Sequence, residues 1–316
     1  MLKKLKLCVI LLSMTVLAVL PAAEEAAGGA EDGAEPKEKR TSVYSVFVNV
    51  VAEDFHFPLF GFVNIARGDQ RFPQFGLVNV NARTLWPGQT GLINIAGKDI
   101  RGVQWGLANT AGGELLGVQL GLASIAARGV EGAQIGLVNI SPKKVRGMQV
   151  GLFNYADSVA GGVPIGLLSI VREGGYRALE LSFAETMPVN LAFKIGVEKF
   201  YSSFIVSFYP DFKDPGANLG FGFGIGSIIP VTNRFFINPE LNSVTPLTLD
   251  QNFVSFTPLA GFKLGSHFSI VAGPSLTYMY TSNDSNSRAP VFTAGKKLND
   301  EHSLLLGVKA GIRIQF

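Results

Sequence analysis

Between residues 60 and 172 the chain repeats one pattern of apolar, small and amide positions every 15 residues. Three positions after each glycine that begins a copy stands Asn or Ser; from the second copy on, Gln stands two positions before the glycine, replaced by Pro164 in the last copy. A degenerate earlier copy holds Asn49. The copies follow one another without insertion or deletion, which indicates a structural unit of fixed length. The glycines are Gly61, Gly76, Gly91, Gly106, Gly121, Gly136, Gly151 and Gly166; the polar ladders are Asn64, Asn79, Asn94, Asn109, Ser124, Asn139, Asn154 and Ser169, and Gln74, Gln89, Gln104, Gln119, Gln134 and Gln149.

Each copy also has a rhythm of five residues. With the glycine as position 1, apolar residues recur at position 5 (for example Ile95), position 10 (Ile100) and position 15 (Trp105). This rhythm predicts three short extended segments per copy, which together form one triangular coil. Stacked coils would align equivalent residues in ladders of Asn, Gln, Ile and Leu, with glycine at the corners. We therefore expect a β-solenoid.

An antiparallel meander with one strand per copy is the competing interpretation. Such strands could join those of the C-terminal half in one 16-stranded barrel. Turns of a meander usually alternate in length, whereas every connection here is equal, so the pattern favours the solenoid. The triangular coil gives no clear burial to one stripe, the leucines at position 2: Leu77, Leu92, Leu107, Leu122, Leu137, Leu152 and Leu167.

After Arg172 the pattern changes to strict alternation. The final segment, LLLGVKAGIRIQF, places apolar side chains on one face and ends in Phe316. The stretch GFGFGIG alternates in the same way, so we assign it to a strand rather than to a phosphate-binding loop. Eight such strands predict an eight-stranded outer-membrane β-barrel. The seven earlier ones are 177–184, 189–198, 200–209, 217–229, 233–243, 252–264 and 267–280.

The connections between these strands alternate in length. Longer segments (ETMP, DFKDPGA, SVTPLTLDQ and the stretch from Thr281 to Glu301) lie at one end, and tight links near Lys199, Pro230 to Asn233 and Gly265 to Ser266 at the other. Long external loops and short periplasmic turns are typical of outer-membrane barrels, so we expect the repeats on the periplasmic side. So narrow a barrel is filled by side chains. The expected inward charges, which must pair, are Glu180, Glu198 and Glu240 with Lys194, Lys263, Lys309 and Arg313.

The N-terminus predicts export. Lysines, a short apolar run and the small residues of Pro21-Ala22-Ala23 indicate a signal peptide over 1–23; the run is short for a transmembrane anchor. Residues 24–42 read as a disordered linker, 43–172 as the repeat domain and 173–316 as the barrel. Cleavage removes three lysines from a chain of formal charge +3, which leaves the mature chain near neutral, and also removes Cys8, the single cysteine. Nucleic-acid binding and disulfides are therefore not expected.

The tandem G-x-Q-x-G-L-x-N copies, followed by PIGLLSIVREGGYRALELSFAETMPVNLAFKIGVEKFY and RFFINPEL, resemble a family of repeat-containing surface or outer-membrane proteins of spirochaetes and Bacteroidetes. The resemblance covers most of the mature chain. It implies an envelope location and a repeat domain followed by a barrel. It supplies no catalytic residue.

Catalytic and metal-binding chemistry have little support in the sequence. The three histidines, His56, His267 and His302, have no metal-ligand spacing. Ser303 beside His302 suggests a lipid hydrolase at the barrel rim, but adjacent strand residues point to opposite faces. We expect no catalytic, cofactor-binding or metal residues and no cofactor.

Three functions remain as hypotheses. The first is an outer-membrane-anchored structural or binding repeat protein without catalytic activity. Its expected partners are outer-membrane lipid around the barrel and an unidentified periplasmic or surface partner of the repeats. The alternatives are porin-like transport through a single large barrel and a rim-sited lipid hydrolase.

Overall fold

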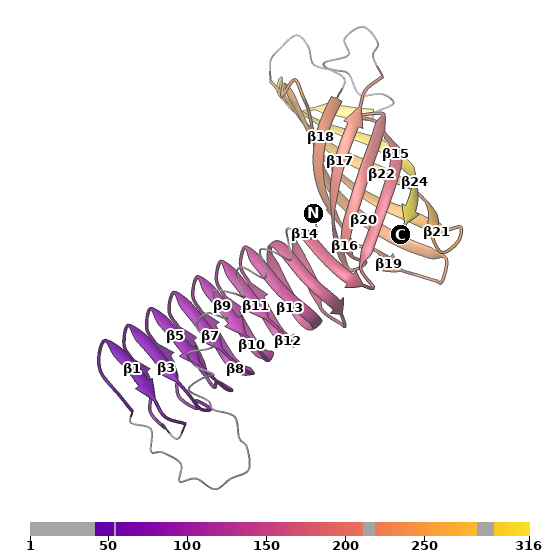
Figure 1. Cartoon of the computed structure of the whole chain (residues 1–316). Helices are drawn as coiled ribbons and strands as arrows, with labels where there is room; N and C mark the ends of the chain where they lie inside the picture. Colours follow the sequence, from indigo (N-terminus) through magenta and orange to yellow (C-terminus); the bar gives the residue numbers. More distant parts are fainter. Residues whose placement is uncertain (1–41, 54, 211–218, 283–293) are drawn as a thin grey trace. The chain divides into compact units, whose positions relative to one another are not determined.

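The computed structural model describes residues 42–53, 55–210, 219–282 and 294–316, and these residues form β-strands without any α-helix (Figure 1). None of the described residues belongs to a helix long and apolar enough to cross a membrane. The predicted signal peptide, and residues 24–41 of the predicted linker, lie outside the described residues. The predicted all-β fold, a solenoid together with a closed barrel, is confirmed.

The first ladder of the solenoid is built from positions 3 to 6 of successive copies. Its strands pair in parallel in the order of the chain, and each residue pairs with the residue 15 positions later, as Asn64 does with Asn79 and Asn79 with Asn94. The strands are β1 (Val48–Val51), β3 (Val63–Ala66), β5 (Val78–Asn81), β7 (Ile93–Ala96), β9 (Ala108–Ala111), β11 (Ala123–Ala126) and β13 (Val138–Val159).

A second parallel ladder contains the residues that precede each repeat glycine. It consists of β2 (Leu59–Phe60), β4 (Gln74–Phe75), β6 (Gly88–Thr90), β8 (Ile100–Trp105), β10 (Glu114–Leu120) and β12 (Gly129–Ile135). The long strand β13 belongs to both ladders, and β14 (Val163–Glu173) pairs with it in parallel. Each coil thus has two named strands rather than three. The third extended segment that was predicted for each coil is present only as a bend: the later strands of this ladder change direction at a glycine of positive φ, such as Gly117 at +151°.

Two amide ladders run through the interior of the coils. The Nδ2 group of Asn64 donates to Oδ1 of Asn79 at 2.7 Å, and Asn79 in turn donates to Asn94 at 2.9 Å. Gln104 donates to Gln89 at 2.8 Å on the other side. These side chains are fully buried. Buried amides require partners, and the next coil supplies them only if its length is unchanged.

The apolar positions divide between the interior and the surface. Position 10 forms the core, since Leu85, Ile100 and Leu115 are inaccessible to solvent. Position 15 does not, although the five-residue rhythm included it: Trp105 is 63% exposed. The leucines at position 2 are also on the surface, with Leu107 51% exposed. The leucine stripe therefore lies outside the coil, beside the ladder of position 15.

The repeat glycines are required by the stacking distance. A Cβ atom on Gly106 would lie 2.3 Å from the carbonyl oxygen of Gly91, the equivalent residue of the previous coil. Since the strands of the repeats pair in parallel across coils, the alternative in which they form antiparallel strands of a 16-stranded barrel is wrong.

The barrel is closed by antiparallel pairing throughout. Eight of its described strands follow one another around the barrel, and the last, β24, pairs with the first, β15. Their bounds lie close to the predicted ones. They are β15 (Tyr176–Ala184), β16 (Val189–Val197), β17 (Phe200–Phe208), β18 (Leu219–Gly226), β20 (Phe235–Pro246), β21 (Gln251–Lys263), β22 (Phe268–Thr281) and β24 (His302–Gln315).

Two short strands were not predicted: β19 (Ile229–Pro230) pairs with β20, and β23 (Ala294–Lys297) pairs with β24. The glycines of the GFGFGIG stretch lie in β18, as predicted, and they leave room for larger side chains of neighbouring strands. A Cβ atom on Gly226 would lie 2.4 Å from the hydroxyl of Tyr201.

The chain forms two compact units, Met1–Gly132 and Ala133–Phe316, so the second contains the last coils of the repeat together with the barrel. Strand pairing changes from parallel to antiparallel between β14, which ends at Glu173, and β15, which begins at Tyr176.

Candidate functional site

The barrel interior holds a compact cluster of charged side chains. Alternation along the strands directs Glu180 of β15, Lys194 of β16, Glu240 of β20, and Lys309 and Arg313 of β24 inward, and all five are buried. The sequence predicted that these five residues face the lumen and pair, and the structure confirms it. We refer to them as the lumen cluster.

Every carboxylate of the lumen cluster contacts more than one cation. Lys309 lies 2.7 Å from Oε2 of Glu240 and 2.9 Å from Oε1 of Glu180. Lys194 contacts both carboxylates, at 3.1 Å in the case of Glu180. The Nε group of Arg313 donates to Glu180 at 3.0 Å. Shared ion pairs of this kind satisfy buried charges that would otherwise be very costly to remove from water.

Two polar side chains that the sequence analysis did not single out complete the lumen cluster. Tyr201 donates from its hydroxyl to Glu240 at 2.6 Å, and Asn238 accepts from Nη2 of Arg313 at 2.7 Å. Asn238 lies on β20, as the predicted Glu240 does, whereas Tyr201 lies on β17, from which no inward residue was predicted. The prediction was based on the need of buried charged side chains to form ion pairs, so it did not include uncharged side chains.

Glu198 and Lys263 do not belong to the lumen cluster, and their predicted inward position is wrong. They pair with each other at 3.9 Å and are half-exposed, at 47% and 38%. Lys263 is the last residue of β21, and Glu198 follows the end of β16. Alternation no longer fixes the direction of a side chain where a strand ends.

A third buried carboxylate lies in the lumen at the opposite end of the strands. Glu185 follows β15, and its Oε1 accepts hydrogen bonds from Ser275 at 2.8 Å and from Thr277 at 2.9 Å. The neighbouring Thr186 and Met187 are buried as well. The sequence had assigned this ETMP segment to a loop outside the barrel, but it folds inward and fills the lumen there. The formal charges of Glu180, Glu185 and Glu240 thereby match those of Lys194, Lys309 and Arg313.

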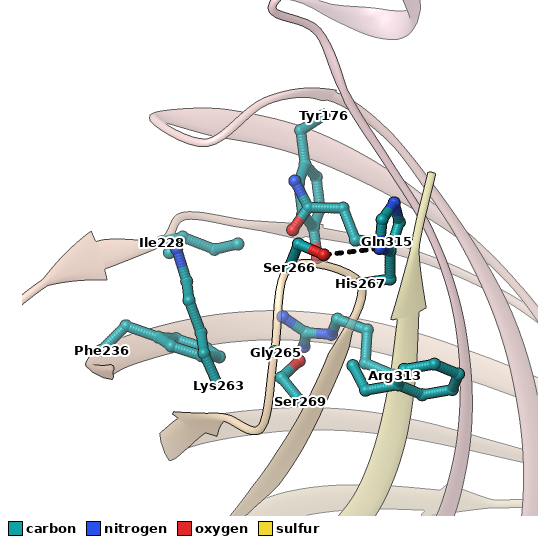
Figure 2. Close-up of a pocket in the computed structure, with 11 residues that line it drawn as sticks. Tyr176, Ile228, Phe236, Lys263, Gly265, Ser266, His267, Ser269, Arg313 and Gln315 are labelled. Carbon is teal, nitrogen blue, oxygen red and sulfur yellow. Dashed lines mark hydrogen bonds between the residues drawn. The ribbon is translucent and has the colours of Figure 1, made fainter. Parts of the chain in front are cut away.

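Figure 2 shows a small pocket at the end of the barrel where β21 meets β22. Arg313, Lys263 and His267 contribute to its lining, together with Ser266 and Tyr176. Its volume of about 10 Å³ is that of a single water molecule. Among the residues that the structure describes, the buried Nη1 atom of Arg313 has no hydrogen-bond partner. The pocket accommodates water rather than a substrate.

In the described part of the chain, the histidines are not brought together with the other groups of a catalytic arrangement. Ser266 and His267 share a hydrogen bond of 2.7 Å within one turn (Figure 2), but among the described residues no carboxylate orients the ring as a triad requires. His302 lies at the other end of the barrel, as predicted. Its Nδ1 is 2.6 Å from the hydroxyl of Tyr278, on which its ring stacks, and it does not face Ser303. His56 lies between β1 and β2, and within the described ranges no group of three metal-binding side chains occurs.

No protein-family model matches this chain, and no curated protein is similar to it in sequence. One solved structure, a KdgM porin in complex with disordered oligogalacturonate, aligns with 45% of this chain and 99% of its own, at 9% identity and a TM-score of 0.21. Similarity this weak assigns neither activity nor ligand, so the site must be interpreted from its own geometry.

Proposed function

We propose that this protein is an exported, non-catalytic binding protein of the outer membrane, in which the barrel is an anchor and the repeat region presents the binding surface. The observation that carries the proposal is the lumen cluster. Five mutually paired charged side chains, with Tyr201 and Asn238, occupy the interior of an eight-stranded barrel. A barrel of this size has no room for an aqueous channel beside such side chains.

The outer surface of the barrel supports a membrane location. Apolar side chains alternate with the inward polar ones and are exposed, as Leu181 and Ile312 illustrate. Aromatic residues lie near both ends: Phe235 packs on Phe262 at 4.8 Å, and Tyr278 and Tyr280 contact His302. An apolar belt between aromatic girdles is typical of outer-membrane barrels. The predicted signal peptide and the resemblance to repeat-containing envelope proteins agree with this proposal.

The test is electrical. We expect the purified full-length protein to give no steady conductance in planar bilayers, because charged side chains fill the lumen. A reconstituted 16-stranded porin in the same lipid is the positive control, and insertion is verified by the heat-modifiable mobility of the folded barrel on a gel. Stepwise conductance from correctly inserted protein would refute the anchor proposal in favour of transport. Recovery of the protein from the soluble periplasm would refute the membrane location.

A further inference from the structure

The solenoid carries an exposed apolar groove that the proposed function leaves without a ligand. It follows one corner of the coils. At this corner each repeat glycine, position 1 of its copy, lies between position 15 of the preceding copy and position 2 of its own. Across the five copies of the first compact unit, this corner comprises residues 60–62, 75–77, 90–92, 105–107 and 120–122, and none of these 15 residues is charged. We call this corner the apolar groove. The surface of a soluble protein domain rarely exposes so continuous an apolar strip unless the strip binds a ligand or a partner.

Side chains form the two walls of the apolar groove, and glycines form its floor. Leu92, Leu107 and Leu122 make one wall and are 48 to 51% exposed. The position-15 residues make the other, where Phe60 and Phe75 stack at 5.2 Å. Gly91, Gly106 and Gly121 lie between these walls and line a hollow together with them.

At Thr90 the wall of bulky residues is interrupted by a small side chain. A hollow of about 350 Å³ opens there, lined by residues 90–92, 105–107 and 121–122. Ligand pockets in proteins begin at about 300 Å³. The small side chain of Thr90, between Phe75 and Trp105 in the ladder, creates this space.

The chemistry of the groove favours hydrocarbon over a polar or peptide ligand. Its backbone groups are already used between coils: the amide of Gly91 donates to Trp105 at 2.9 Å, and that of Leu92 donates to Leu77 at 2.9 Å. Of its ten side chains, only those of Thr90 and Trp105 can form hydrogen bonds. Protein interfaces need many hydrogen bonds, and a peptide that adds to a sheet needs a free strand edge. The groove offers neither.

From this geometry we infer that the apolar groove binds the acyl chain of an individual lipid, extended along the axis of the solenoid. The hollow is lined by residues of three successive coils, which are two steps of about 4.8 Å, or about 10 Å, apart. A fully extended hydrocarbon advances about 1.3 Å per carbon, given a C–C bond of about 1.5 Å, so roughly seven carbons of an acyl chain fill the hollow, and the rest of the chain lies along the neighbouring apolar corners. The inference rests on the proposed function, which keeps the protein next to lipid, and names the ligand class of its binding surface.

The test uses the full-length protein in amphipol and hexadecanoic acid that carries a photoreactive diazirine. After irradiation, labelled peptides are identified by mass spectrometry. We expect label at the groove residues and none at the exposed, charged side chains of the same coils, such as Lys98 and Arg101. Label on the outer belt of the barrel serves as the internal reference.

Matched variants at Thr90 make the test specific. Thr90→Trp fills the hollow and should reduce groove label several-fold relative to the barrel reference, whereas Thr90→Ser should not. The fold tolerates the large side chain because Trp105 occupies the equivalent place one coil later.

Three results would overturn the inference. The first is absence of groove label in protein that is correctly anchored, which leaves the proposed function intact. The second is groove label unaffected by Thr90→Trp, which indicates contact with a membrane surface. The third is dimerisation in analytical ultracentrifugation that Leu107→Glu abolishes, which makes the face a contact between two copies. Conductance or periplasmic recovery would instead overturn the proposed function.

Discussion

Asn79 uses its single side-chain NH₂ group twice, for the carbonyl oxygen of Thr90 and for Oδ1 of Asn94, both at 2.9 Å. The same two bonds recur in the next coil, where Asn94 donates to Trp105 and to Asn109. Each buried amide thus ties a coil to its neighbour at the corner below the apolar groove. A polar residue here holds the corner in shape, which an apolar side chain of similar volume could not do.

Replacement of one such amide should therefore be costly. Asn94→Leu leaves the Asn79 amide without one of its acceptors and removes two donated bonds. We expect a loss of about 1 to 3 kcal/mol in the free energy of unfolding, the cost of unsatisfied buried polar groups. The measurement is denaturant unfolding of the full chain in detergent. Leu92→Asn, a similar exchange on the exposed face, is the control and should change stability by less than about 0.5 kcal/mol; equal effects would contradict the interpretation.

In the lumen cluster the critical residue is Arg313. Arg313→Met removes a cation from two buried carboxylates, and breaking a buried pair in this way costs about 3 to 5 kcal/mol. On a gel, the band of the folded Arg313→Met variant should change to the mobility of the unfolded protein at a clearly lower heating temperature than the band of the unchanged protein. Lys263→Met, which breaks the half-exposed pair with Glu198, should leave that temperature nearly unchanged. If both variants behave alike, the cluster does not stabilise the barrel.

At the scale of elements, the strands of the barrel were the most predictable part of the chain. The predicted strand 189–198 is observed as Val189–Val197, and 200–209 as Phe200–Phe208. Period-two alternation is sharp because one face meets lipid and the other a polar lumen. The same alternation located Lys194 and Glu240 correctly, whereas Glu185 was missed because its segment reads as a loop.

In the repeats, the period revealed the solenoid but not the direction of every side chain. Apolar residues at position 15 look like core residues in a sequence, since burial normally explains a regular spacing of apolar residues, whereas the leucines at position 2 had no clear place in the predicted coil. Leu107 and Trp105 are nevertheless exposed. The interior is already occupied by amides, which the sequence pattern alone did not place inside.

A change of register tests the solenoid directly. Deletion of Lys144, in β13 next to the fully buried Val145, should destabilise the repeats strongly, because coils on either side can no longer align. Limited proteolysis of the full chain reports the effect. Val145→Ile should be mild, and deletion of the complete copy 136–150 should restore resistance. A single-residue deletion as resistant as Val145→Ile would contradict the stacked register.

At the scale of the whole molecule, assembly depends on closure between the last and first barrel strands. Phe316 donates its backbone amide to Arg177 at 3.1 Å and packs against Phe193 at 6.5 Å. Deletion of Phe316 should reduce the fraction of protein recovered in the outer membrane, because the closing strand loses this bond and its terminal aromatic. Phe316→Tyr keeps both and is the control. Undiminished insertion of the deletion variant would show that closure does not need this residue.

The constant spacing between repeat glycines also determines how such a gene can change during evolution. Gain or loss of a few codons in the repeats breaks the ladder, whereas gain or loss of 15 codons adds or removes one complete turn, about 4.8 Å of height. Homologous genes should therefore differ in length by whole multiples of 15 codons. The length of the solenoid, and with it the length of the groove, can then evolve only in steps of one coil.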